Sequence, residues 1–293
     1  ILYCTLRYRA SAFVDFEYKS MAKSIDRLSA LIKRFRIDAR VHPTIPGTCE
    51  IGPPDRNANL FIVESGGLAL TGPGHVQTHC PAPALLYYPR GLPPGQKVHA
   101  HAEKMRLVCA TVEVGGNRNP VTQALPERLL VSLEPNASLR AVSDLLMEEA
   151  HSPRCGGDAV MHRLCEVLII RLLRHAIESE QAETGLLAGL AHPTLSRTIV
   201  AMHEHPDRKW SLEALADTAM MSRTRFAQTF RTVVGVTPGS YLSAWRLSVA
   251  ETELAQGKRL KAVAPRVGYS SSAALSRAYS RRFGAAPTQR RNA

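Results

Sequence analysis

One segment of the chain occurs twice, and this repeat constrains the fold more than any other feature. The first copy, MSRTRFAQTFRTVVGVTP, begins at Met221, and the second, SSAALSRAYSRRFGAAP, begins at Ser271. In both copies a serine is followed thirteen residues later by glycine, and three residues after that by proline. Serine caps the start of a helix, whereas glycine and proline end one. Each copy therefore predicts a helix with the same start and stop signals.

A shorter helical segment precedes each copy. SLEALADTA begins at Ser211, and LKAVAPRV begins at Leu260. Two helices joined by a short turn, with apolar positions spaced for packing at a steep angle, predict a helix-turn-helix. Phe226 and Phe230 are expected to face inward in the first motif, and the matching positions of the second motif carry Leu275 and Tyr279.

The two motifs are expected to differ in detail. Counting from Ala216 to Ser222 and from Ala264 to Ser271, the turn of the second motif is one residue longer. If the scaffold helix of that motif starts near Arg259, Pro265 lies beyond its first turn and removes a backbone hydrogen bond. If the helix instead starts near position 261, the proline falls in the first turn and costs little.

The positive charge of the chain is concentrated in its last third. The whole sequence carries 37 basic and 25 acidic residues, for a net charge of +12. From His192 onward there are 16 basic and 6 acidic residues, a net of +10, whereas the first 191 residues hold 21 and 19, a net of +2. Carboxylates near phosphates would be repelled, so this distribution is typical of a domain that binds a polyanion such as DNA. A solvated basic face is the alternative interpretation.

Before this basic region the sequence has two further zones. From about residue 43 to 117, Gly and Pro separate short apolar runs of strand length, which predicts a small barrel or sandwich. These runs are NLFIVE, GLALTG, ALLYYP, QKVHAHA and MRLVCATVEV. After Pro135 two stretches, SLRAVSDLLMEEA and DAVMHRLCEVLIIRLLRHAIESE, have helical periodicity. The second is apolar almost all round, so we expect it to be buried in its own domain or against a partner chain.

Several classes of protein are disfavoured. No apolar run reaches the ~18 residues of a membrane span, and residues 1–20 lack the pattern of a signal peptide. The six cysteines, at positions 4, 49, 80, 109, 155 and 165, have no zinc-type spacing and fit reduced thiols in a cytoplasmic protein. Nucleophile elbows and phosphate loops are also absent from the sequence.

The C-terminal motifs resemble a known family. LEALADTAMMSRTRFAQTFRTVVGVTPGSYL and VAPRVGYSSSAALSRAYSRRFGAAP are similar to the double helix-turn-helix domain of the AraC/XylS transcription regulators. The VGY turn, the SR run and the FGAAP ending carry the most specific part of the match. The first half resembles the cupin-type regulatory domain of one branch of that family, through ALLYYPRG, RLVCATVEV and the two helices that follow.

The resemblance implies an α+β protein in four parts and assigns DNA-contacting residues. The parts are an extension (1–24), a cupin-like regulatory and dimerisation domain (25–180), a linker (181–191) and a double helix-turn-helix domain (192–293). Base-facing positions fall on Arg223, Thr224, Ala227 and Gln228 in the first motif, and on Ser272, Ala273 and Arg277 in the second. Arg277 is expected to bind guanine, whereas Gln228 is expected to read adenine or to contact little. Arg231 and Arg282 are expected to contact phosphates, and Arg281 is a further expected DNA-binding residue.

The function implied is that of a cytoplasmic, sequence-specific transcriptional regulator. Its expected partners are double-stranded DNA, a second copy of the chain, RNA polymerase if it is an activator, and a small-molecule effector. We expect no cofactor, no metal and no membrane association. The alternative is a metal-dependent cupin enzyme with an appended basic helical domain.

Two features of the first half suggest what it senses. His99, His101 and Glu103 in HAHAE could contribute metal ligands, but the cupin metal pattern is incomplete here, so an exposed polar strand is the preferred interpretation. Cys49 and Cys109 match cysteine positions of cupin-type relatives and are the predicted oxidant-sensitive pair; the alternatives are a loop cysteine and a small core residue. Cys80, expected in a turn beside His79, is their competitor.

Overall fold

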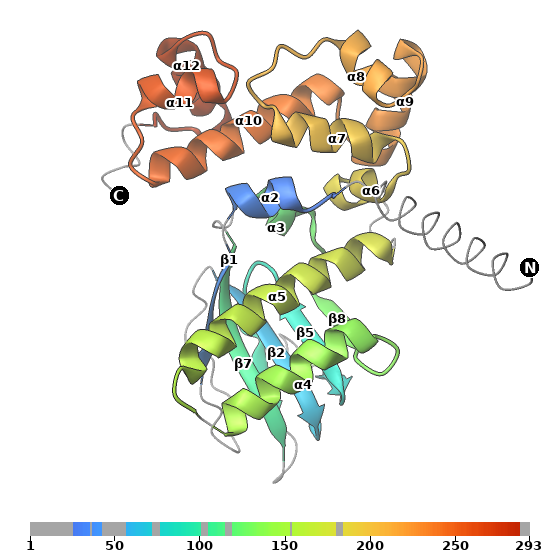
Figure 1. Ribbon diagram of the computed structural model, residues 1–293, viewed down its shortest axis with the longest axis vertical. Helices are drawn as coiled ribbons and strands as arrows, with labels where there is room; N and C mark the ends of the chain where they lie inside the picture. The colour runs from blue at the N-terminus through green and yellow to red at the C-terminus, as the bar shows by residue number, and fades with distance from the viewer. Residues whose placement is uncertain are drawn as a thin grey trace, which may run out of the picture.

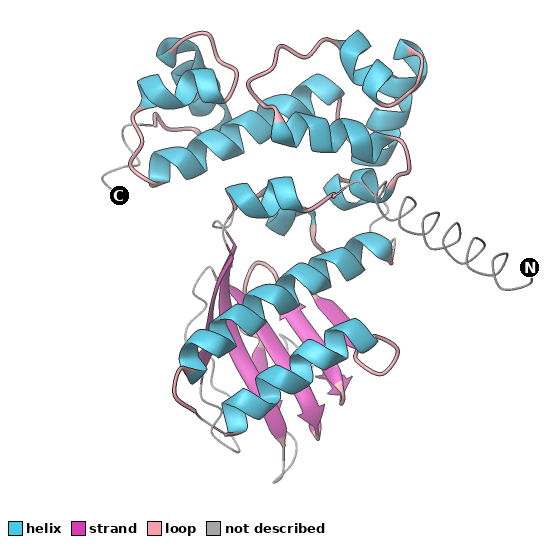
Figure 2. Ribbon diagram, in the orientation of Figure 1, coloured by secondary structure: helices cyan, strands magenta, loops and turns pink. Residues whose placement is uncertain are grey.

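The computed structural model describes residues 26–35, 37–42, 57–71, 77–100, 105–114, 119–152, 154–179 and 184–287. Figure 1 shows a β-rich half below and an all-helical half above, with short helices between them. Coloured by secondary structure, all strands lie in the lower half (Figure 2). The predicted class, α+β with a β-rich first half and a helical second half, is confirmed.

The larger sheet has five antiparallel strands, in the order β1-β7-β2-β5-β8. Their bounds are β1 Ile37–His42, β2 Ala58–Ser65, β5 Ala84–Tyr88, β7 Arg106–Val114 and β8 Leu129–Ser132. The first six residues of β2 are all buried, whereas a strand with one wet face would alternate. Both faces of this sheet are therefore covered.

A second sheet of three strands covers one of those faces. Its antiparallel order is β4-β3-β6, with β3 Gly67–Thr71, β4 Gln77–Pro81 and β6 Lys97–Ala100. The two sheets share a cluster of buried side chains: Phe61, Val63, Leu68, Leu70, Cys80, Ala84, Leu86, Tyr88, Val98, Leu107 and Cys109. The two sheets therefore pack against each other through these side chains.

Two helices, α4 (Ala137–His151) and α5 (Gly157–Glu178), lie across the other face of the larger sheet (Figure 1). The periodicity of α5 places five apolar residues on one stripe. Leu168, Leu172 and Ile177 are buried, whereas Met161 and Leu164 are half-buried. The apolar surface of α5 packs mainly inside its own half, and Val160 and Val167 remain 42% and 41% exposed. The homodimer stays a prediction.

The sequence predicted five of the strands and missed three. β1 and β8 lie outside the zone 43–117, and β4 falls where a turn around Cys80 was expected. The short helices α2 (Ser29–Arg34) and α3 (Pro120–Ala124) were not predicted either. The side chain of Asn119 accepts a hydrogen bond from the backbone N–H of Val121 at 2.8 Å, a local signal that marks the start of α3.

The C-terminal half contains seven helices among residues 184–287. They are α6 Leu186–Ala191, α7 Leu195–Glu204, α8 Leu212–Thr218, α9 Arg223–Val234, α10 Pro238–Ala255, α11 Leu260–Arg266 and α12 Ser272–Phe283. The stretch 181–191 was expected to be a linker; a helix, α6, occupies its second half, with Leu186, Leu187 and Leu190 buried. These apolar residues are part of the core, so the linker prediction is wrong for residues 186–191.

The two halves share one continuous hydrophobic core. Phe35, just after α2, meets Trp245 of α10 edge-on, with 5.5 Å between ring centroids. Arg34 of α2 donates hydrogen bonds to the backbone oxygens of His203 (3.2 Å) and Glu204 (3.4 Å) at the end of α7. A basic side chain suits the C-terminal end of a helix, where carbonyls lack intrahelical partners. The N-terminal segment therefore anchors the β-rich half to the helical half.

Among the described residues, none of the helices combines the length and the apolar character needed to cross a membrane.

Candidate nucleic-acid interface

The first predicted motif is a helix-turn-helix. Helices α8 and α9 are joined by four residues, 219–222, and pack against each other. Serine side chains cap both helices: Ser211 accepts from the backbone N–H of Ala214 at 3.1 Å, and Ser222 accepts from that of Arg225 at 3.4 Å. The helix boundaries and caps agree with the prediction.

The second motif follows the same plan. Helices α11 and α12 are joined by five residues, 267–271, so the predicted extra residue in this turn is confirmed. Ser271 caps α12 by accepting from the backbone N–H of Ala274 at 3.1 Å. Helix α11 starts directly after Arg259, whose side chain makes no capping hydrogen bond. Pro265 therefore lies inside the helix beyond its first turn, as the first alternative predicted.

Both scaffold helices end in the same way, although the second turn is one residue longer. The amide of Met221 donates to the carbonyl oxygen of Ala216 at 3.0 Å, and the amide of Tyr269 donates to that of Ala264 at 2.9 Å. The residue before each donor has a left-handed backbone: Met220 with φ 55° and Gly268 with φ 78°. Glycine adopts this conformation freely, whereas methionine is strained in it. The first turn therefore holds a strained residue that the second avoids.

The recognition helices α9 and α12 bury the residues that the sequence predicted. Phe226 and Phe230 are fully buried, with 5.6 Å between their ring centroids, and Phe230 also meets Tyr241 of α10. Leu275 and Tyr279 occupy the matching positions of α12 and are buried too. Because these inner faces are fixed, the opposite faces of both helices point to solvent.

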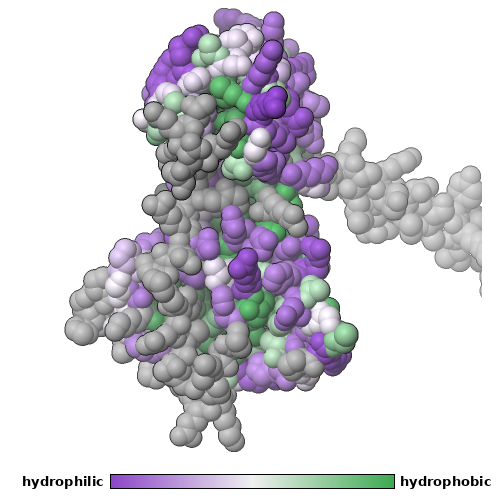
Figure 3. Space-filling model, turned by 90° about the vertical axis from the view of Figure 1, so that its left-hand side faces the viewer, coloured by the Kyte–Doolittle hydropathy of each residue, from purple (hydrophilic) through white to green (hydrophobic). Residues whose placement is uncertain are grey.

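The outer faces carry the residues predicted to contact DNA. In α9, Arg223, Thr224, Gln228 and Arg231 are exposed, and Ala227 is half-buried. In α12, Ala273, Arg277, Arg281 and Arg282 are exposed, and Ser272 is half-buried. On the side of the molecule seen in Figure 3, hydrophilic residues cover much of the described surface of the upper half. All ten predicted residues are thus at least partly accessible, and their contacts with DNA stay predictions.

One acidic neighbour of these residues was not predicted as part of the site. Glu213 of α8 forms an ion pair with Arg223, with 2.7 Å between Oε1 and Nη1. The hydrogen bond from Arg223 is the main reason why the pKa of Glu213 lies below its usual value. The pair depends on how α8 and α9 cross, which the sequence pattern does not specify.

Helix α10 holds the two motifs together. Trp245 is buried in α10 and stacks on His203 of α7, with 3.9 Å between ring centroids. Glu253, also in α10, is bound by Arg266 of α11 at 3.1 Å and by Lys258 at 3.4 Å. Figure 1 shows α10 passing from α11 and α12 at one end to the first motif at the other. Both recognition helices are therefore fixed to one support.

Two of the cysteines considered for oxidant sensing, Cys80 and Cys109, are buried. Cys109 is buried between the sheets; Cys80 is also buried there, in β4 rather than in a turn, while His79 is exposed. The turn expected at Cys80 is therefore wrong. Burial raises the pKa of Cys80 to about 11, which favours the neutral thiol. Cys49 lies outside the described residues, and the oxidant-sensitive pair stays a prediction.

The remaining cysteines and the histidine motif add little to a sensor site. Cys165 is buried, and its pKa is raised to about 12, whereas Cys155 is exposed. His99 is exposed on β6, while Cys4, His101 and Glu103 lie outside the described residues. In the described ranges no group of three or more His, Cys, Asp or Glu residues is placed to hold a metal ion.

Two family models match separate parts of the chain. Residues 26–178 match the family model of a cupin, and residues 215–293 match that of a helix-turn-helix domain. The chain is 33% identical over 199 residues to the RCS-specific HTH-type transcriptional activator RclR of Escherichia coli K12, a match that covers 66% of this chain and 70% of RclR.

A second relative is an AraC-like transcription regulator of Streptomyces lividans. It is 35% identical over 149 residues, which are 50% of this chain and 49% of that protein, so the chain matches only about half of its length. Among solved structures, ToxT from Vibrio cholerae O395 aligns with 89% of this chain and 98% of its own, at 12% identity and a TM-score of 0.39.

The strained turn of the first motif leads to a stability prediction. Met220→Gly should raise the free energy of unfolding by about 0.5–1 kcal/mol, because it relieves a left-handed residue at an exposed site. The matched change Gly268→Ala should lower it by about 2 kcal/mol or more. The added Cβ would lie 2.6 Å from the carbonyl oxygen of Pro206 and 2.7 Å from the Arg246 guanidinium.

Urea denaturation of both variants measures these changes. Loss of stability in Met220→Gly would show that the contact between Met220 and Arg197, 3.5 Å from Sδ to Nη1, outweighs the backbone strain.

Proposed function

Because the chain belongs to the AraC family of transcriptional regulators and carries a cupin domain ahead of its helix-turn-helix domain, we propose that α9 and α12 read one promoter sequence as a single rigid unit. The chain is a DNA-binding transcriptional regulator. We further propose that the first half of the chain controls how α9 and α12 bind DNA.

The single observation that supports this proposal is the attachment of both recognition helices to α10. This helix has 18 residues, so it is about 27 Å long at a rise of 1.5 Å per residue. Successive major grooves on one face of DNA are ~34 Å apart. Two recognition helices held at the two ends of such a support are suited to enter successive grooves.

We assign different roles to the exposed residues of the two helices. Arg223, Thr224, Ala227 and Gln228 of α9, and Ser272, Ala273 and Arg277 of α12, lie in the first two turns of their helices, the part of a recognition helix that contacts base edges. Arg231, Arg281 and Arg282 lie nearer the C-terminal ends, and we assign them to phosphates. In this proposal the residues of the first two turns provide sequence specificity, and the arginines near the C-terminal ends provide affinity for any DNA sequence.

The control by the first half is proposed to pass through α6. Gly189 of α6 packs so closely that a Cβ would lie 2.5 Å from Cδ1 of Ile199 and 3.0 Å from Cγ2 of Val234, the last residue of α9. The amide of Gly185 also donates to the carbonyl oxygen of Val233 at 2.9 Å. A shift of α6 therefore moves the C-terminal end of a recognition helix.

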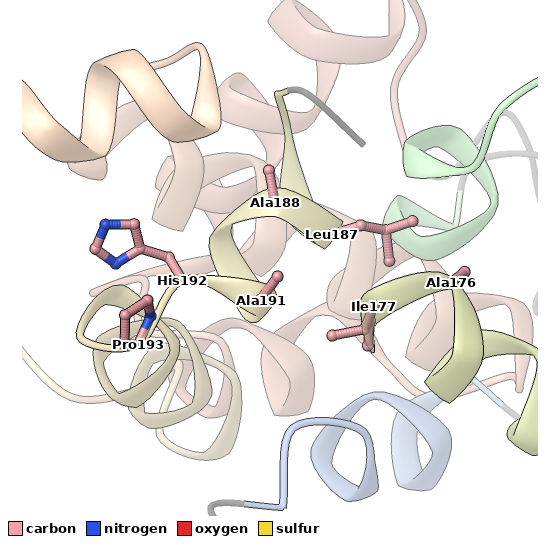
Figure 4. A pocket seen from close by; sticks show the side chains of 7 residues that line it. All are labelled: Ala176, Ile177, Leu187, Ala188, Ala191, His192 and Pro193. Carbon is pink, nitrogen blue, oxygen red and sulfur yellow. The ribbon is translucent and has the colours of Figure 1, made fainter. Parts of the chain in front are cut away.

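A cavity gives α6 room for such a shift on its other side. It has a volume of about 240 Å³ and lies between the end of α5 and α6. In Figure 4, Ile177 of α5 lies opposite Leu187 and Ala191 of α6. Close packing resists displacement of a helix, and the side of α6 that faces this cavity is less closely packed than the side that contacts α7 and α9. The predicted effector, a small molecule or an oxidant, would act through this junction.

The regulator interpretation is favoured over a metal-dependent cupin enzyme because the curated relatives are transcriptional regulators. The proposed place of action is the cytoplasm, where promoter DNA is accessible. RNA polymerase contact and a homodimer stay predictions.

Arginine substitutions test the proposed roles in α12. Arg277→Ala should lose ~1–3 kcal/mol on a duplex selected from a random library by the wild-type protein, and little on a scrambled duplex, because a base contact is lost. Arg282→Ala should weaken binding to both duplexes and reduce the salt slope by about one. Fluorescence anisotropy at several salt concentrations measures both. Equal losses on the two duplexes for Arg277→Ala would contradict its base-reading role.

A pair of glycine substitutions tests the route through α6. Gly189→Ala should displace α6 from α7 and α9, which should raise hydrogen exchange at the C-terminal end of α9 and weaken binding to the selected duplex several-fold. Gly239→Ala is the matched control, since its added Cβ would meet no heavy atom within 4 Å beyond the adjacent residues and the backbone of its own helix. It should leave exchange in α9 unchanged. If Gly189→Ala behaves like this control, α6 does not transmit a signal to α9.

A further inference from the structure

The two motifs differ in charge at one equivalent position of their scaffold helices. The carbonyls of Ala216 and Ala264 accept equivalent hydrogen bonds in the two turns, which sets the correspondence between α8 and α11. Three residues earlier, α8 carries Glu213, whereas α11 carries Lys261. Both side chains are exposed. The second motif thus presents a cation where the first presents a carboxylate.

The carboxylate of the first motif is bound to a recognition residue. The Nη1 of Arg223, at the first position of α9, donates to the Oε1 of Glu213 at 2.7 Å, and the side chains are 64% and 59% exposed. An ion pair this exposed contributes little to folding. The pair therefore has little effect on stability. Because Arg223 is the first residue of α9 and a predicted DNA contact, the pair can affect DNA binding instead.

Near DNA, the energy of this ion pair depends on whether Arg223 binds a phosphate or a base. If Arg223 leaves Glu213 to bind a phosphate, Glu213 is left without its partner near a polyanion and is repelled. If Arg223 reaches a base edge while one of its N–H groups stays on Glu213, the carboxylate remains neutralised, and the guanidinium has further donors for the base. Glu213 thus disfavours the sequence-independent contact and favours the base contact.

We propose that Glu213 is a specificity-determining residue, which holds Arg223 away from phosphates and orients it toward a guanine. This rests on the proposed base-reading role of α9. The second motif has Ser272 at the position of Arg223 and lacks this restraint, so Lys261 is free to add phosphate affinity. The pair of Glu213 and Arg223 then adds selectivity to the first motif. Lys261 adds sequence-independent affinity to the second motif, beside the base contact proposed for Arg277.

The test compares Glu213→Gln with Asp217→Asn in the full chain. Asp217 is exposed on the same helix α8, and no ion pair of its carboxylate occurs among the described residues, so its substitution removes the same charge without releasing Arg223. The probes are a duplex selected by the wild-type protein from a random library and a scrambled duplex of the same composition.

Glu213→Gln should bind the scrambled duplex at least threefold more tightly than Asp217→Asn does, with a salt slope steeper by about 0.9. Its ratio of selected to scrambled affinity should fall by at least threefold. Asp217→Asn should strengthen both complexes equally and keep the wild-type ratio. Adding Arg223→Ala should remove the difference between the two variants.

Equal behaviour of Glu213→Gln and Asp217→Asn on both duplexes would overturn the role of Glu213 while leaving DNA reading by α9 intact. A wild-type protein that does not discriminate between the duplexes would contradict the proposed function itself, and the role of Glu213 with it. Thermal denaturation of each variant shows that the changes in binding are measured on folded protein.

Discussion

Trp245, near the middle of α10, is buried between His203 of α7 and Phe35 of the N-terminal segment. Burial lowers the pKa of His203 to about 3, so its ring is neutral, and its Nε2 is 2.7 Å from the hydroxyl of Tyr241. Tyr241 in turn supports Phe230 of α9. This chain of aromatic contacts fixes α10, and through α10 it fixes both recognition helices and their attachment to the β-rich half.

The two copies of the motif share the hydrogen bonds that end their scaffold helices, but they differ in the side chains that they expose. Both turns use the same hydrogen bonds and the same left-handed position, yet one has methionine and the other glycine there. Both recognition helices bury two large side chains on the inner face, yet only the first carries a carboxylate beside its opening arginine. Because packing requires only the inner face and the turn, the outer faces are free to take different roles in DNA binding.

The features that could be predicted from the sequence are those set by local signals. The serine caps and the glycine at the end of each helix fixed α9 and α12 to the correct residues, and the spacing of Phe226 and Phe230 showed which face is exposed. Strand β1 was missed because its stability depends on pairing with β7, far away in the chain. Helix α6 was missed because its glycines and short length suggest a linker, whereas close packing of Gly189 stabilises it. The pair of Glu213 and Arg223 depends on the crossing of two helices, which no local pattern specifies.

The central claim is that two recognition helices on one support read a single face of DNA. Hydroxyl-radical footprinting of the full chain on its selected duplex tests this claim most directly. We expect two protected segments of DNA backbone per bound copy, centred ~10 base pairs apart and on the same face of the duplex. A single protected segment, or two segments on opposite faces, would contradict it.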